Sequence, residues 1–137
     1  MLFLRLDIIL DTIYVLVKSN GGAKTKFPDL MGIYKKSSRK ENLFPEYDQV
    51  DGTGLIYENR GEWVVINTND PNYPNGDFPF LMYSKVPTNP AHQLPSKKDW
   101  HYLDDGYEET DTTLTMLLLS PGLNMTFLFF VKFFFFD

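Results

Sequence analysis

The chain has 137 residues, a formal net charge of -5 and no cysteine, and 16% of its residues are aromatic. That length suits a single domain, and the aromatic content is too high for a wholly disordered acidic chain. The absence of cysteine excludes disulfide scaffolds, thiolate zinc sites and cysteine nucleophiles. The acidic balance argues against a general nucleic-acid binder, which needs a basic face. Composition leaves the compartment open.

The N-terminal lead, residues 1–11, is apolar but carries three charged side chains inside its apolar block. No small-residue cleavage site follows, so the lead lacks the pattern of a secretory signal. Residues 12–17 are rich in β-branched and aromatic side chains, which predicts a strand. Asn20-Gly21-Gly22 ends it.

Two consecutive chain reversals are the strongest local signal. Residues 46–50, 54–58 and 62–67 have strand-like composition, and Asp51-Gly52 between the first two tolerates the positive φ angles of a tight hairpin. Residues 59–61 form the second predicted turn, with Gly61 at the left-handed position of a three-residue loop. These segments predict a self-pairing ribbon over residues 46–67.

The three-residue loop fixes a register for the second hairpin. Glu58 then faces Glu62, and Tyr57 faces Trp63. An aromatic cross-strand pair of this kind contributes about 0.2–1 kcal/mol relative to two alanines. The two glutamates count against the register because like charges repel, although solvent at a hairpin end softens that penalty.

The remaining strand signals are short and separated by turns and proline-rich loops. They predict an all-β fold, a small antiparallel meander, sandwich or open barrel of about six to eight short strands with an apolar C-terminal tail. The predicted organisation is a lead at 1–11, a single β domain at 12–118 and a Phe-rich low-complexity tail at 119–137. The further strand candidates are residues 32–34, 81–86, 100–103 and 112–116, with a turn at 104–106.

The tail holds seven of the 12 phenylalanines in its last eleven residues and has neither helical nor strand periodicity. Three interpretations stay open: a membrane span through residues 114–136, a last strand followed by an interfacial anchor, or translated non-coding sequence at a misread exon boundary. A span needs about 20 apolar residues, but Pro121-Gly122, Asn124 and Lys132 interrupt this one. Exposed, such a tail is an aggregation hazard.

The order of spaced aromatics over residues 19–115 resembles an aromatic-rich β-repeat module of large multidomain proteins from marine invertebrates and other animals. The resemblance implies a β fold and transfers no activity and no catalytic residue. The loop at 71–80 departs from the pattern through its extra Pro and Asn, and the resemblance stops where the tail begins. The segments that carry it are 19–23, 31–34, 45–52, 56–57, 63–65, 83–86, 100–102 and Asp111-Thr112-Thr113-Leu114.

No motif for catalysis or for a cofactor is present, so we expect no enzyme and no cofactor. The serines lack a nucleophile elbow, and Gly52-Thr53-Gly54 joins two strands rather than a strand and a helix. The two histidines, His92 and His101, are too few for a zinc site without carboxylates. Acidic clusters at 104–111 and 70–77 could hold calcium, but neither has calcium-loop spacing and solvated turn charges explain them better.

Four aromatic residues are candidate ligand contacts: Trp63, Trp100, Tyr102 and Tyr73. Exposed, three of them, Trp63, Trp100 and Tyr102, would form with Tyr57 and Tyr83 a flat platform on which sugar rings stack. The alternative, which we favour for the two tryptophans, is that they anchor the core, because a domain of this size needs its largest residues inside.

A basic run at residues 35–40 could bind phosphate or accept phosphorylation at Ser37 or Ser38, although a solvated loop explains it better. Two functions remain. One is a non-catalytic β interaction module for a protein or a glycan, with no nucleic-acid partner. The other is a membrane-tethered or structural unit anchored by the apolar tail. The oligomeric state stays unknown.

Overall fold

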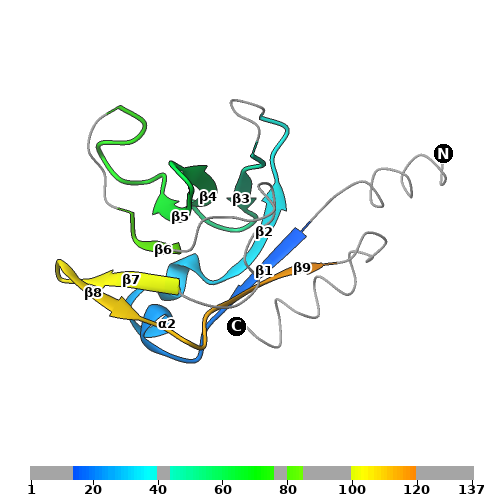
Figure 1. The fold of residues 1–137 in the computed structure, drawn as a ribbon. Coiled ribbons are helices and arrows are strands. Elements are labelled where there is room, and N and C mark those ends of the chain that lie inside the picture. Colours follow the sequence, from blue (N-terminus) through cyan, green and yellow to red (C-terminus); the bar gives the residue numbers. More distant parts are fainter. Residues whose placement is uncertain (1–13, 40–43, 76–79, 85–99, 120–137) are drawn as a thin grey trace.

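The computed structural model describes residues 14–39, 44–75, 80–84 and 100–119. These residues form an all-β domain with one short helix and one 3-10 turn (Figure 1). Nine strands are present in these ranges, one more than the upper end of the expected number. The elements are β1 (Tyr14–Lys18), α2 (Gly22–Lys26), η1 (Pro28–Leu30), β2 (Gly32–Lys36), β3 (Tyr47–Gln49), β4 (Gly54–Asn59), β5 (Glu62–Asn67), β6 (Met82–Ser84), β7 (Trp100–Asp104), β8 (Tyr107–Thr110) and β9 (Thr115–Leu119).

All nine strands belong to one sheet in the order β8-β7-β6-β5-β4-β3-β2-β1-β9. Strands β1 to β8 are therefore an antiparallel meander, as predicted, and β9 returns to pair with β1. The expected strand at 112–116 is shifted to 115–119, and β8 was not anticipated. Because β9 includes Leu119, the last strand extends one residue past the predicted domain boundary; residues 120–137 and the lead lie outside the described residues.

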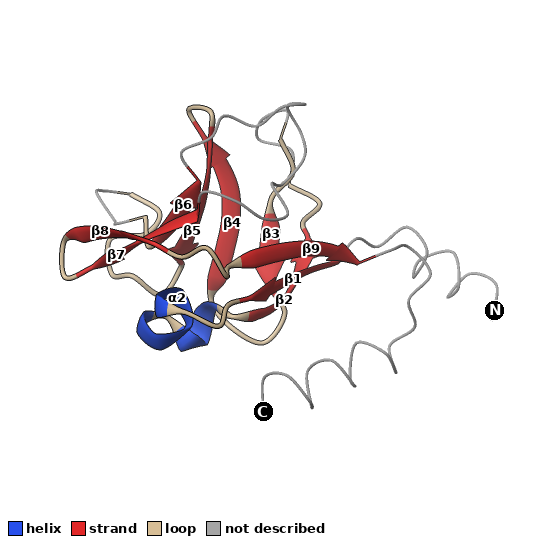
Figure 2. Ribbon diagram, turned by 60° about the horizontal axis from the view of Figure 1, so that its bottom comes forward, coloured by secondary structure: helices blue, strands red, loops and turns tan. Residues whose placement is uncertain are grey.

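The sheet curls into a half-barrel, and chain length shows why. Strands β8 and β9 lie at opposite edges of the sheet, yet only residues 111–114 connect them. Five Cα steps span at most about 18 Å, whereas the edges of a flat nine-stranded sheet are about 38 Å apart. The sheet must therefore bend until its edges approach each other, as Figure 2 shows.

The predicted register of the second hairpin is wrong by one residue. Glu58 faces Trp63 and Tyr57 faces Val64, so the expected pair of Tyr57 with Trp63 does not form. The turn has two central residues, not three: Arg60 and Gly61 both have positive φ, 52° and 86°. Positive φ at both positions is the signature of a type I′ turn, whose twist matches that of the flanking strands.

The concave face of the sheet holds the core. Both tryptophans are fully buried there, at 0% exposure, so the core interpretation of Trp63 and Trp100 is confirmed. The Trp63 ring meets Phe44 edge-on with ring centroids 6.0 Å apart and lies 6.5 Å from Tyr47. Strands β1 to β7 and β9 supply residues to this face, whereas all four residues of β8 are exposed. The buried cluster includes Val15, Val17, Tyr34, Tyr47, Ile56, Trp63, Val65, Met82, Trp100, Leu114 and Met116.

A buried carboxylate ties the two ends of the described chain together. Asp111 is 4% exposed and follows β8. One of its oxygens accepts hydrogen bonds from the Ser19 hydroxyl (2.6 Å) and the Ala23 N–H (2.9 Å). The other accepts from the N–H and hydroxyl of Thr113, at 2.8 and 2.6 Å. Burial alone would raise the pKa of Asp111, but the hydrogen bonds from Ser19, Thr113 and Ala23 outweigh it and lower that pKa.

Candidate functional site

The four aromatic residues predicted to contact a ligand do not form a common platform. Trp63 and Trp100 have no exposed ring face, because both lie in the core. Tyr102 is half-buried on the concave face and packs against Gly22 of α2. Tyr73 is half-buried in the loop after β5, near Tyr57. A binding role for Tyr102 and Tyr73 stays a prediction.

Strand pairing instead assembles a different group of side chains on the convex face. Residues directly opposite in an antiparallel sheet point to the same side. Tyr83 of β6 faces His101 of β7, and His101 faces Thr110 of β8. Glu108 faces Leu103, which places it diagonally beside His101. We call Tyr83, His101, Glu108 and Thr110 the β6–β8 patch.

The patch is a connected network of short contacts. The Tyr83 and His101 rings stack with centroids 5.5 Å apart and an interplanar angle of 27°. The Tyr83 hydroxyl donates to Glu108 Oε2 at 2.6 Å. Glu108 Oε1 lies 3.4 Å from His101 Nδ1, and the Thr110 hydroxyl lies 3.2 Å from the same nitrogen. Three strands thus hold one carboxylate and one imidazole in fixed positions.

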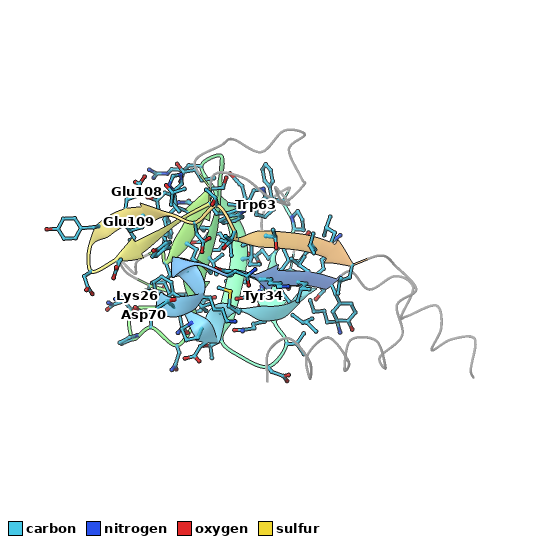
Figure 3. All side chains as sticks on the ribbon, turned by 90° about the horizontal axis from the view of Figure 1, so that it is seen from below. Lys26, Tyr34, Trp63, Asp70, Glu108 and Glu109 are labelled. Atoms are coloured by element: carbon cyan, nitrogen blue, oxygen red, sulfur yellow. The ribbon has the colours of Figure 1, made fainter. Side chains whose placement is uncertain are left out.

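Exposure leaves parts of this network open to a ligand. The Glu108 side chain is 39% exposed and the His101 side chain 14%. Figure 3 shows Glu108 and Glu109 along β8, well away from Tyr34 in the interior. Burial raises the pKa of the Tyr83 hydroxyl, and its hydrogen bond to Glu108 raises that pKa further. Tyr83 therefore stays a neutral hydrogen-bond donor at physiological pH.

The geometry is not that of a nucleophile activated by a base. In a hydroxyl–histidine–carboxylate triad, the hydroxyl and the carboxylate address different nitrogens of the imidazole. Here Thr110 and Glu108 both contact Nδ1 of His101. The carboxylate therefore does not orient the imidazole for Thr110 through the opposite nitrogen, and these contacts do not form such a triad.

The acidic run of residues 104–111 is divided among separate partners. Asp104 and Asp105 both pair with Lys26, at 3.2 and 3.0 Å. Glu108 belongs to the β6–β8 patch, and Asp111 is held by Ser19, Ala23 and Thr113. Within the described residues, no group of three or more His, Cys, Asp or Glu side chains could hold a metal ion. The acidic side chains of residues 104–111 therefore do not form a single metal site in this part of the chain.

The predicted membrane segment falls only partly within the described residues. Residues 115–119 are the strand β9, hydrogen-bonded to β1. Leu114 is buried in the core, and residues 120–136, like His92, lie outside the described residues. Across the ranges that the structure describes, no helix has the length and apolar character needed to cross a bilayer.

No protein-family model matches the chain, and no match was found among curated proteins or solved structures. The case for a function therefore rests on the residues themselves. The patch as a group was not predicted from sequence, although Tyr83 was a candidate for the aromatic platform and part of the remaining signal is present. Asp105-Gly106 is a hairpin signal, and a strand drawn through residues 107–110 places Thr110 opposite His101.

Proposed function

We propose that this chain is a non-catalytic β interaction module that binds a protein or a glycan through the β6–β8 patch. The observation that carries the proposal is the network itself, in which Glu108 joins the stacked Tyr83 and His101 rings on the solvent side of three strands. Strands position binding groups more accurately than loops do. Aromatic side chains with polar tips are enriched at recognition surfaces.

Each group in the patch has something to offer a ligand. The second nitrogen of His101, Nε2, makes no hydrogen bond to another described residue. The Glu108 carboxylate has four lone-pair positions, and Tyr83 and Thr110 contribute hydroxyl groups. A peptide or a sugar that presents donors to Glu108 would find a preorganised acceptor, which reduces the ordering cost of binding.

The test is a binding screen with the full chain against a glycan array and a peptide library. Glu108→Gln keeps the side-chain volume and removes the charge, so we expect it to weaken any hit about tenfold or more, since hydrogen bonds to charged groups contribute about 1.5–3 kcal/mol. Val50→Ala is the matched control, because Val50 is also exposed, at 51%, but lies at the β3–β4 turn. Equal binding by the wild type and Glu108→Gln would refute the assignment of the patch.

The second function, a membrane-tethered or structural unit held by the apolar tail, has no supporting observation among the described residues. It stays a prediction from sequence, as does the expectation that nucleic acid is not a partner. The binding screen distinguishes the two functions, because binding through the β6–β8 patch does not depend on the tail.

A further inference from the structure

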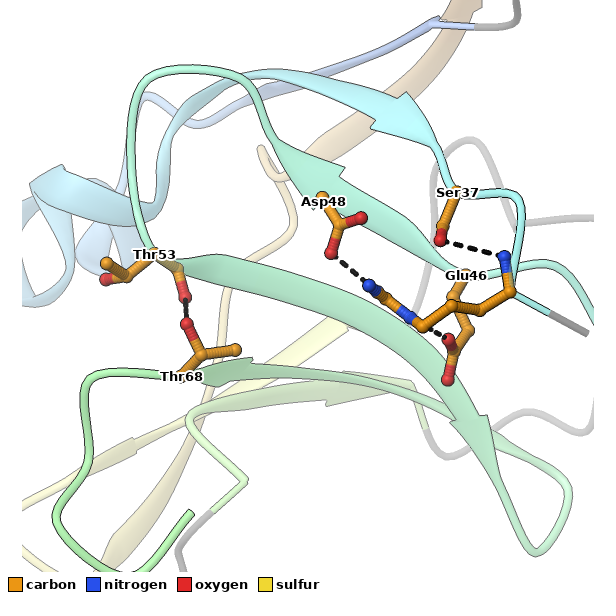
Figure 4. Close-up of polar contacts among 6 residues, drawn as sticks. Ser37, Glu46, Asp48, Thr53 and Thr68 are labelled. Atoms are coloured by element: carbon orange, nitrogen blue, oxygen red, sulfur yellow. Dashed lines mark hydrogen bonds and ion pairs between the residues drawn. The ribbon is translucent and has the colours of Figure 1, made fainter. Parts of the chain in front are cut away.

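The basic run of residues 35–40, which begins at the end of β2, has a structural role that the sequence did not indicate. Arg39 is not freely solvated: its Nε donates to Glu46 at 2.8 Å and its Nη2 donates to Asp48 at 2.6 Å. These two ion pairs link Arg39 to Asp48 in β3 and to Glu46, the residue just before β3 (Figure 4). The hydrogen bonds to Asp48 and Glu46 raise the pKa of Arg39, so its charge is permanent.

The two serines in the run differ in how accessible their hydroxyl groups are. Ser37 is half-buried, its N–H donates to the Glu46 carbonyl at 2.8 Å, and its hydroxyl accepts the Arg39 N–H at 3.0 Å. Ser38 is exposed, and its hydroxyl makes no hydrogen bond to another described residue. Of the two hydroxyl groups, that of Ser38 is therefore the more accessible to an enzyme.

The charges around Ser38 are ordered along the chain. Lys35 and Lys36, both exposed, are the last two residues of β2 and precede Ser38 by three and two positions. Arg39 follows it directly. Charge patterns next to the acceptor hydroxyl are a principal means by which kinases select substrates. This pattern fits a serine kinase whose substrate groove is acidic.

We propose that Ser38 is a phosphorylation site for such a base-directed serine kinase, and that the phosphate takes Arg39 from Glu46 and Asp48. In the transfer, Ser38 Oγ forms a bond to the γ-phosphorus of ATP while the bond to the bridging β–γ oxygen breaks. ADP leaves, and the hydroxyl proton passes to the catalytic carboxylate of the kinase and then to solvent.

The phosphate is a stronger competitor for Arg39 than either carboxylate. It carries about -1.5 to -2 charges at pH 7, and a guanidinium binds phosphate through two parallel hydrogen bonds. Once Arg39 turns toward it, Glu46 and Asp48 lose the cation that lies between them. Residues 37–39 then lose their side-chain attachment to β3. Phosphorylation thus changes the surface beside β2 and β3, which is separate from the β6–β8 patch.

The first test incubates the folded full chain with ATP and a base-directed serine kinase, and the site is read by mass spectrometry. We expect one phosphate on Ser38, none in Ser38→Ala and unchanged labelling in the matched control Ser37→Ala. Replacing Lys35 and Lys36 with alanine should lower kcat/KM by about tenfold. Labelling at Ser37, no labelling, or indifference to the two lysines would overturn the assignment of Ser38.

The second test measures whether the phosphate engages Arg39. The second pKa of phosphoserine is about 6, and a bound guanidinium lowers it. A phosphorus NMR titration should therefore give a pKa below that value for the phosphorylated wild type and a higher pKa for phosphorylated Arg39→Gln. Equal phosphate pKa values in the two proteins would show that Arg39 stays paired with Glu46 and Asp48. That result would overturn the proposed transfer of Arg39 to the phosphate.

Discussion

Asp111→Asn tests the link that holds the two ends of the described chain together. The carboxylate of Asp111 accepts four hydrogen bonds, two on each oxygen, from Ser19, Ala23 and Thr113. An amide keeps one oxygen and replaces the other with a donor; when the amide nitrogen faces Thr113, it can donate to the Thr113 hydroxyl, so the Thr113 N–H is the one group left without its acceptor. The chain around this position is buried, and water cannot replace the lost acceptor at no cost.

The magnitude follows from that one unpaired donor. A buried donor left without a partner costs about 1–3 kcal/mol, and bonds to charged groups lie toward the upper end. We therefore expect Asp111→Asn to lower the free energy of unfolding by about 1–3 kcal/mol. For a domain of this length, that corresponds to a drop in Tm of roughly 4–12 °C.

The assay is urea unfolding of the full chain, followed by tryptophan fluorescence and circular dichroism. Asp105→Asn is the matched control: the Asp105 side chain is 86% exposed and pairs with Lys26, and its backbone has a positive φ that asparagine tolerates. We expect the control to change stability by less than about 0.5 kcal/mol. If Asp111→Asn cost no more than the control, the proposed role of Asp111 would be wrong.

The same carboxylate predicts a pH dependence. The pKa of Asp111 is lower in the folded chain than its ordinary value of 3.8, so the unfolded chain binds a proton more readily. Its contribution is complete above about pH 4 and is lost as the pH falls through the folded-state pKa. In urea titrations between pH 7 and pH 3, the advantage of the wild type over Asp111→Asn should begin to shrink at the acid end. A constant difference would contradict this.

Two further substitutions probe the core and the hairpin register. Gly54→Ala should lower the free energy of unfolding by about 1–3 kcal/mol, because a Cβ at this position would overlap the hydroxyl of Tyr34. Tyr34 is fully buried, and its hydroxyl donates to the Leu30 carbonyl at 2.7 Å. An unchanged Tm would show that the Tyr34 side chain can move aside. Arg60→Asn should stabilise the chain by about 0.5–1 kcal/mol, because asparagine adopts the positive φ at this turn more easily; a loss of stability would argue against the two-residue turn.

The strands of this domain were more predictable than their register. Residues 62–67 were predicted with the observed bounds, and the turn around Asp51-Gly52 was correctly placed. The register between β4 and β5 failed because three residues in a row of β4 and four in β5 are buried, so no polar–apolar alternation marks a face. Arg60 at a left-handed position also gave no signal, since arginine is uncommon there.

The sites depend on contacts between distant parts of the chain. The bond from Ser19 to Asp111 joins residues 92 positions apart, and Tyr83 meets Glu108 across 25 positions. Propensity and periodicity are local properties, so they cannot pair such residues. The burial of the two tryptophans could be predicted from the sequence, because their size alone favours a place in the core. The β6–β8 patch required the observed order of the strands.

The most direct test of the functional account is a titration of the first ligand found in the glycan or peptide screen against the full chain, Glu108→Gln and Val50→Ala, with heats of binding measured by calorimetry. The account predicts that the wild type and Val50→Ala bind alike and that Glu108→Gln binds about tenfold more weakly or worse. Undiminished affinity in Glu108→Gln, or a chain that retains no glycan and no peptide, would contradict it.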